Sequence, residues 1–187
     1  MATSNVSMVT GQQILFNLSA SYAPATLNNL ELGTATDVEI DLTDVAAGAA
    51  EGSAKADLTA TWAPEYAVHA AIEFATEPVT GTYVEFYWAP SVSGTAGQGN
   101  PAYVSGTSAA YTGTPGTLAE GLAQLQKIGV MACGADATGS IQTAYLGKFA
   151  PSTRYGTLVV YNGTADAFHS DAVEMAVSFT PVIPQAS

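Results

Sequence analysis

Apolar and polar residues alternate along much of this chain, and this period of two limits the folds that are open to it. In the stretch DVEIDL, the apolar residues Val38, Ile40 and Leu42 alternate with acidic residues. Successive side chains of a strand point to opposite faces, so this pattern predicts a strand with one buried face and one face in water. Similar strand patterns occur in QQILFNL, ADLTATW, YAVHAAIEF, TYVEFYWA, SIQTAYLGKF, YGTLVVYN and AVEMAVSF.

These strands predict an all-β protein. Roughly eight or nine short strands, separated by turns rich in Gly, Pro, Asn and Thr, are typical of an antiparallel β-sandwich, and we expect one that is jelly-roll-like. The length allows a single domain over residues 1–187, and we expect residues 1–10 to form a flexible N-terminal arm. The fold class expected is therefore a one-domain sandwich.

One short helix is predicted in TLAEGLAQLQK. Thr117 stands three residues before Glu120, which is the spacing of a capping box. Leu118, Leu122 and Leu125 follow at helical intervals. We expect this helix to close one end of the sandwich.

The charges of the chain exclude one class of partner. Its net charge is −12, and only 11% of its residues are charged, against roughly 25% in soluble domains. Nucleic-acid binding requires clustered cations, so neither DNA nor RNA is expected as a partner. The only four bases are Lys55, Lys127, Lys148 and Arg154. Most of the acids lie between Glu31 and Glu85, where they favour solubility over a specific site for a cation or a basic partner.

The sequence also carries no signal for a membrane or a secretory pathway. No window approaches the ~20 apolar residues of a membrane span, so no membrane partner is expected. The first residues, MATSNVSMVTGQQILFNL, lack the basic and apolar regions of a signal peptide. Cys133 is the only cysteine, and in the apolar run IGVMAC it is expected to be a small buried side chain. Synthesis and folding in a cytoplasm are expected.

The adjacent residues His169, Ser170 and Asp171 raise the question of a hydrolase site. In a catalytic triad each side chain contacts the next in space, which three consecutive residues do not readily achieve. The chain also lacks the Gly-x-Ser-x-Gly pattern of a nucleophile elbow. Because FHSD stands between two strand patterns, we interpret it as a hairpin-like connection and expect no catalytic residue and no enzyme.

Metal and cofactor sites are not expected either. His69 and His169 have no ligand partner at the spacings of known metal motifs, and phosphate-binding and dinucleotide-binding patterns are missing from the sequence. Carboxylates that repeat along one strand do not converge on an ion by themselves. A weakly held divalent ion near Asp41 and Asp44 is the one alternative left open.

The segment 89–117 is the most unusual part of the chain. It is longer than an ordinary connection, and loops of this length are usually functional or disordered. No Asp, Glu, Lys, Arg or His occurs between Phe86 and Ala119, so covering this stretch would bury no charge. The two readings are a contact surface and a floppy surface loop. If it is a contact surface, the interface residues expected are Trp88, Tyr103, Val104 and Tyr111.

Several stretches of the second half are similar to a known group of proteins. They are FYWAPSVSGTAGQGNPAYVSGTSAAYTG, QLQKIGVMAC and GKFAPSTRYGTLVVYNGTADAFHSDAVEMAVSFTPVIP. The chain resembles tailed-bacteriophage virion structural proteins over roughly residues 83–184, most specifically in RYGTLVVYN and DAVEMAVSFTPVIP. The first part of the chain carries only the strand pattern.

The resemblance implies a function in the virion. The expected role is that of a decoration, or cement, protein that binds the outside of the capsid shell after synthesis in the host cytoplasm. The expected partners are the major capsid protein and further copies of the chain, as a homotrimer or homodimer around a local symmetry axis. The alternative is a tail or baseplate protein that contacts host surface glycans. The resemblance transfers no catalytic residue.

Overall fold

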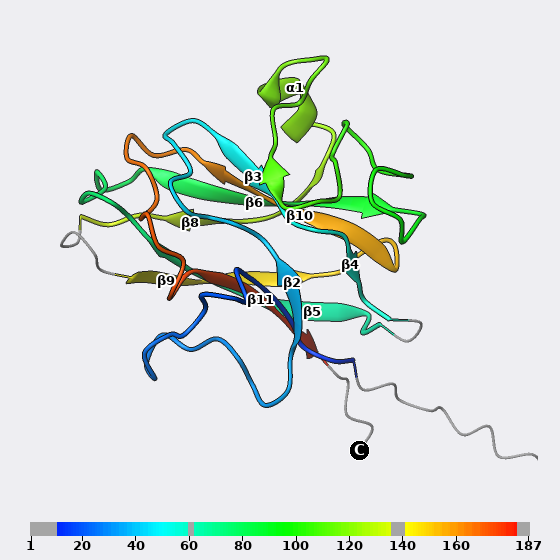
Figure 1. Ribbon diagram of the computed structural model, residues 1–187, viewed down its shortest axis with the longest axis horizontal. Coiled ribbons are helices and arrows are strands. Elements are labelled where there is room, and N and C mark those ends of the chain that lie inside the picture. Colours follow the sequence, from blue (N-terminus) through cyan, green and yellow to red (C-terminus); the bar gives the residue numbers. More distant parts are fainter. Residues whose placement is uncertain (1–10, 60–61, 136–140, 183–187) are drawn as a thin grey trace, which may run out of the picture.

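Two β-sheets packed face to face make up the protein (Figure 1). The computed structural model describes residues 11–59, 62–135 and 141–182. In order across the first sheet, the strands are β2 (Thr36–Glu39), β1 (Ile14–Asn17), β11 (Ala176–Val182), β5 (Glu65–Glu73) and β9 (Ile141–Phe149). The second sheet contains β7 (Ala109–Ala110), β3 (Ala50–Gly52), β10 (Tyr155–Asn162), β6 (Tyr83–Ser91) and β8 (Gln126–Ala132), with β4 (Ala56–Asp57) also paired to β10.

The pairing of the strands is that of a jelly roll. When the short strands β2, β4 and β7 are set aside, the first strand pairs with the last (β1 with β11) and the second with the seventh (β3 with β10). The third pairs with the sixth (β5 with β9) and the fourth with the fifth (β6 with β8). All these pairs are antiparallel, and such nested pairing arises when one long hairpin is rolled into two sheets. The predicted jelly-roll-like sandwich is confirmed.

The core between the sheets follows the alternation of the sequence. Val68, Ala70 and Ile72 of β5 face the interior and are fully buried, as are Phe86 and Trp88 of β6. The Trp88 ring lies at the centre of an aromatic cluster, with ring centroids 6.4, 5.9 and 5.7 Å from those of Phe16, Phe149 and Phe179. Cys133 is also buried in this core, as predicted.

Several predicted strands have different bounds in the structure. The strand of DVEIDL ends at Glu39, and local turns explain the differences in two others. The described residues of ADLTATW form only β4, because the backbone turns at Thr59, whose φ is +72° and whose N–H donates to the Asp57 carboxylate. AVEMAVSF enters the sheet only at Ala176. Its first part is held outside the sheet, where the backbone N–H of Val173 donates to the Asp171 carboxylate.

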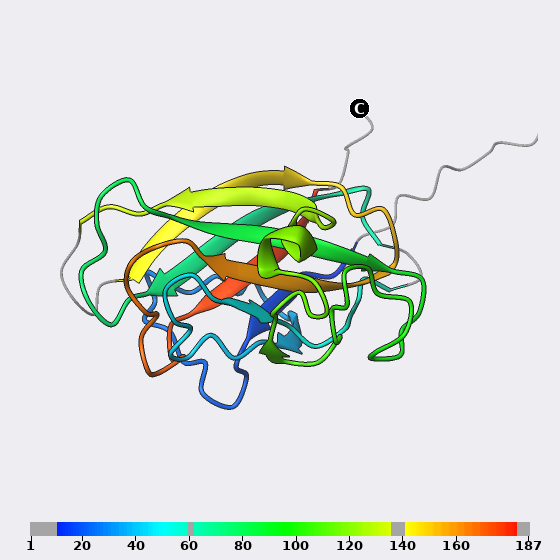
Figure 2. The ribbon, with the colours of Figure 1, turned by 90° about the horizontal axis from the view of Figure 1, so that it is seen from above.

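The predicted helix is present as α1 (Leu118–Leu122), with the capping box between Thr117 and Glu120. Its position differs from the expected one. Figures 1 and 2 show α1 lying over the outer face of the second sheet, above β6 and β10, and not at an end of the sandwich. The reason is that Leu122 and Leu125 pack into a second hydrophobic cluster on that face.

The described residues include no helix that is long and apolar enough to cross a membrane. The arm predicted at residues 1–10 lies outside the described residues.

Candidate functional site

Residues 89–91 of the uncharged segment 89–117 belong to β6. The remaining residues, 92–117, fold onto the outer face of the second sheet. Beneath this segment and α1 lies the second hydrophobic cluster, which is separate from the core between the sheets. The cluster consists of Ala50, Tyr87, Ala89, Ala102, Val104, Tyr111, Leu122, Leu125 and Val159. The segment is therefore an ordered layer with an exposed outer side. We call the exposed residues of 92–117 the uncharged surface.

The structure separates the four residues expected at an interface. Trp88 is fully buried in the core, and Val104 and Tyr111 are 4% and 6% exposed in the second cluster. These three side chains pack within the chain itself, which corrects the expectation that they present themselves to a partner. Tyr103 is 69% exposed and is the one of the four that a partner could cover.

Tyr103 stands on a strained but firmly held turn. Ala102 and Tyr103 have φ values of +49° and +59°, a left-handed conformation that is uncommon for residues other than glycine. The hydroxyl of Tyr111 donates to the carbonyl oxygen of Ala102 at 2.9 Å, and Asn100 Nδ2 donates to the carbonyl oxygen of Val104 at 2.7 Å. Such conformations persist where the surrounding structure fixes them, and they cluster at binding sites.

Lys55 also helps to hold this turn in place, through hydrogen bonds to residues that precede it. Its ammonium group donates to Ser91 Oγ at 2.7 Å, to the carbonyl oxygen of Gln98 at 3.1 Å and to the Asn100 side chain. Partial burial lowers the pKa of Lys55. This role of Lys55 could not be predicted from the sequence, because Lys55 lies far from the segment along the chain and no motif joins them.

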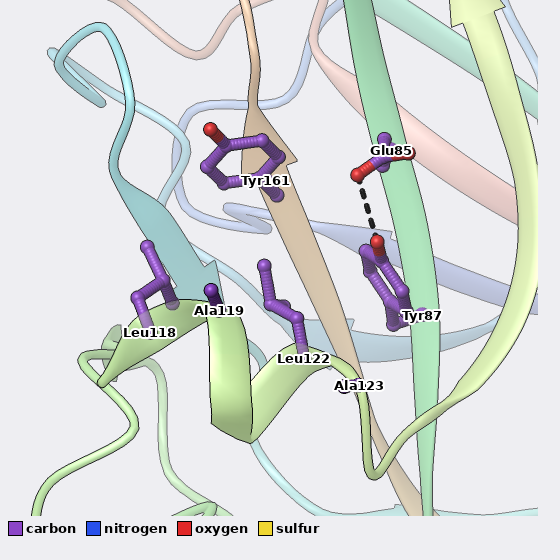
Figure 3. Close-up of a pocket in the computed structure, with 7 residues that line it drawn as sticks. All are labelled: Glu85, Tyr87, Leu118, Ala119, Leu122, Ala123 and Tyr161. Atoms are coloured by element: carbon purple, nitrogen blue, oxygen red, sulfur yellow. Dashed lines mark hydrogen bonds between the residues drawn. The ribbon is translucent and has the colours of Figure 1, made fainter. Parts of the chain in front are cut away.

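A hollow of about 410 Å³ opens beside the uncharged surface, between α1 and the second sheet (Figure 3). The rings of Tyr87 and Tyr161 and the carboxylate of Glu85 lie on the sheet side, with Leu118 and Leu122 opposite on the helix. Glu85 accepts hydrogen bonds from the Tyr87 hydroxyl at 2.7 Å and from Lys127 Nζ at 2.5 Å. Burial opposes ionisation of Glu85, but these two hydrogen bonds and the charge of Lys127 together outweigh it and lower the pKa of Glu85. The hollow thus combines apolar walls with one fixed polar group.

The connection that contains FHSD runs from β10 to β11, which belong to different sheets. It is therefore a crossing between sheets and not the hairpin-like turn that we expected. The backbone N–H of Asp171 donates to His169 Nδ1 at 3.2 Å. Within the described parts of the chain, no hydrogen bond joins Ser170 to His169, so the serine is not positioned as a nucleophile beside a base.

Glu73 lies beside this connection, although it is distant from it in sequence and no sequence pattern indicated the contact. The ligand atoms of Glu73, His169 and Asp171 all lie within 4.8 Å of one another. His169 therefore has neighbours with metal-ligating atoms, although the sequence spacing suggested none. Glu73 is the last residue of β5, and the alternation of YAVHAAIEF had indicated only that it points away from the core.

Asp41 and Asp44, where a weak divalent ion was the alternative, have other contacts. Asp41 Oδ1 accepts hydrogen bonds from the backbone N–H and the hydroxyl of Thr43, at 3.0 and 2.6 Å. The backbone N–H of Asp44 donates to the carbonyl oxygen of His169 at 3.1 Å. Burial, followed by the charge of Asp41, raises the pKa of the nearby Glu51 to about 7.

The sequence matches no protein-family model and no curated protein.

Proposed function

We propose that this chain is a non-enzymatic virion structural protein that binds the outside of a capsid shell and stabilises it. The observation that carries the proposal is the uncharged surface, from which Tyr103 projects on a turn fixed by Tyr111, Asn100 and Lys55. The resemblance in the second half of the sequence supplies the virion context. The proposed location is the capsid exterior.

The uncharged surface has the properties that such a contact requires. Neutral groups lose less hydration than ions when a partner covers them, so the desolvation free energy of burying this surface is small. Val92 is 83% exposed and Tyr103 is 69% exposed, which gives a partner apolar area to cover. Tyrosine is enriched among the residues that dominate interface energies, and a side chain held in place beforehand loses little entropy on binding.

The fold and the net charge also suit this role. Jelly rolls occur in viral capsid domains and lectins, although fold alone does not establish function. The net charge of −12 limits self-association before assembly and opposes contact with a genome. The partners we propose are the major capsid protein and further copies of the chain, as a homotrimer or homodimer around a local symmetry axis.

Co-sedimentation with capsid shells that lack this protein tests the proposal. Replacing Tyr103 with Ala should weaken shell binding at least about fivefold, which corresponds to more than ~1 kcal/mol. Tyr145→Ala is the matched control, because Tyr145 is 57% exposed but lies on β9 in the other sheet. Equal binding of wild type and the Tyr103 variant would contradict the proposed contact. Tyr111 is unsuitable for this test because its loss would disturb the turn itself.

A second candidate function is that of a tail or baseplate protein that contacts host surface glycans. The hollow of Figure 3 favours it, because two tyrosine rings beside a fixed carboxylate are groups that can bind sugars by stacking and hydrogen bonding. A glycan array distinguishes the two functions. Binding that Tyr161→Ala abolishes and Tyr103→Ala leaves unchanged would support the glycan function over the capsid function.

A further inference from the structure

We propose that Glu73, His169 and Asp171 form a binding site for a divalent transition-metal ion of the zinc type, at the junction between the end of β5 and the connection from β10 to β11. This site is independent of the uncharged surface and lies on other elements of the fold.

The backbone holds the three residues together in advance. The N–H of His169 donates to the carbonyl oxygen of Glu73 at 2.9 Å, and a β-bridge joins Phe74 to Phe168. The rings of Phe74 and Phe168 pack edge to face, with centroids 5.5 Å apart, and both side chains are buried. His169 and Glu73 are thus fixed beside each other by main-chain pairing on one side and core packing on the other.

The carboxylate of Glu73 is the feature that calls for a ligand. Glu73 is 9% exposed, its carboxylate oxygens still reach the surface, and no hydrogen bond to its side chain is found in residues 11–59, 62–135 and 141–182. A largely buried carboxylate is costly unless it is paired or coordinates a metal. A cation beside the carboxylate would remove this cost.

The ligand set selects the class of ion. One imidazole with two carboxylates suits zinc and its neighbours among the first-row metals, whereas calcium prefers six to eight oxygen ligands. Nδ1 of His169 lies 3.4 Å from Oδ2 of Asp171, close to the spacing of about 3.3 Å that ligands at zinc–ligand distances of about 2.0 Å require. An ion at Nδ1 would replace the hydrogen bond that this nitrogen accepts from the Asp171 backbone N–H. Oδ1 of Asp171 accepts a hydrogen bond from the Val173 N–H, while Oδ2 faces His169 and is the oxygen that would bind the ion. Three protein ligands leave a fourth position for water.

A bound metal ion would link the connection from β10 to β11 with the end of β5. A ligand that binds only the folded chain stabilises it in proportion to the logarithm of its concentration over its Kd. The proposed ion is therefore expected to raise the melting temperature of the free protein.

The test is titration of the full chain, stripped with a chelator, with ZnCl₂ and CoCl₂. We expect one zinc ion per chain, a higher melting temperature with zinc, and cobalt absorption bands in the visible region that zinc displaces. Glu73→Gln and His169→Gln should each weaken zinc binding at least tenfold. His69→Gln is the matched control, because His69 is the other histidine of the chain and stacks on Tyr145, with ring centroids 4.9 Å apart.

Several outcomes would overturn the proposal. They are no zinc binding by the wild-type chain, equal binding by the His169 and His69 variants, and stabilisation by calcium but not by zinc. Near-ultraviolet circular dichroism of each variant shows whether it is folded. If either variant fails to fold, Asp171→Asn takes its place, since Asp171 is exposed, and unchanged zinc binding by that variant would likewise count against the site.

Discussion

The hydroxyl of Tyr111 donates a hydrogen bond of 2.9 Å to the carbonyl oxygen of Ala102, directly before the exposed Tyr103. The bond is buried, and it links the second hydrophobic cluster to the strained turn on the uncharged surface. One buried tyrosine thus fixes the position of its exposed counterpart. The partner contact that we propose for this surface therefore depends on residues that the partner would not touch.

Replacing Tyr111 with Phe should loosen this turn without emptying the second cluster. The ring remains, but the carbonyl oxygen of Ala102 loses its donor, so we expect the free energy of unfolding to fall by about 1 kcal/mol. Limited proteolysis should cut the segment 92–117 faster than in wild type. Tyr103→Phe, which changes an exposed hydroxyl, should leave both measurements unchanged. Identical proteolysis of all three proteins would show that the bond does not hold the turn.

Lys55→Met should also loosen the turn that carries Tyr103. The substitution keeps much of the aliphatic stem but removes the ammonium group that contacts Ser91, Gln98 and Asn100. We expect a loss of at least about 1 kcal/mol in unfolding by denaturant, because hydrogen bonds to charged groups are stronger than neutral ones. Lys148→Met is the control, since Lys148 makes one exposed contact of 3.4 Å with Glu65. A larger loss in the control would contradict this role of Lys55.

Gly156→Ala should be strongly destabilising, because a Cβ at this position of β10 would clash with the indole of Trp88. Overpacking a core typically lowers the free energy of unfolding by about 1–3 kcal/mol. Because the Trp88 ring is rigid and buried, we expect Gly156→Ala to lower it by about 3 kcal/mol or more. Gly134→Ala provides the comparison, as a Cβ there meets nothing within 4 Å. Thermal melts of the two variants measure the difference. Trp88→Phe, with its smaller ring, should partly restore the stability of the Gly156 variant.

The raised pKa of Glu51 predicts how the stability of the protein depends on pH. The carboxyl has a pKa of about 7 in the folded chain, raised from 4.5 by burial and then by Asp41, so the folded state binds its proton more tightly than the unfolded chain does. The free energy of unfolding should therefore fall as the pH rises from about 4.5 to about 7, and then level off with respect to this group.

Glu51→Gln should make stability depend less on pH in this range. The variant should match wild type near pH 4 and be more stable at pH 8, because the amide carries no charge to desolvate. Urea denaturation at a series of pH values measures the effect. The exposed Glu39→Gln on β2 serves as the control and should keep the wild-type slope. An unchanged slope in the Glu51 variant would refute the assignment.

The period of two in the sequence predicted which faces of β5 and β6 form the core. It did not predict β8, because the burial along QKIGVMA does not alternate cleanly at this edge of the second sheet. The short β3 and β7 were missed for a related reason. They are only two or three residues long, and their pairing depends on neighbours that are distant in sequence.

The candidate sites were less accessible to sequence reasoning than the fold. The alternation of TYVEFYWA placed Trp88 on one face with Val84 and Phe86, which indicated the core, yet the enrichment of aromatic residues at interfaces suggested a contact. Residue type alone does not distinguish these two uses of an aromatic ring. The proximity of Glu73 to His169 depends on the crossing between sheets, and no local pattern records it.

Cryo-electron microscopy of the virion that carries this chain tests the proposed function most directly. Density on the capsid exterior around local symmetry axes, with Tyr103 and the uncharged surface against the major shell subunits, is the predicted result. Density on the tail or its tip, or on the capsid with the uncharged surface turned to solvent, would contradict the account.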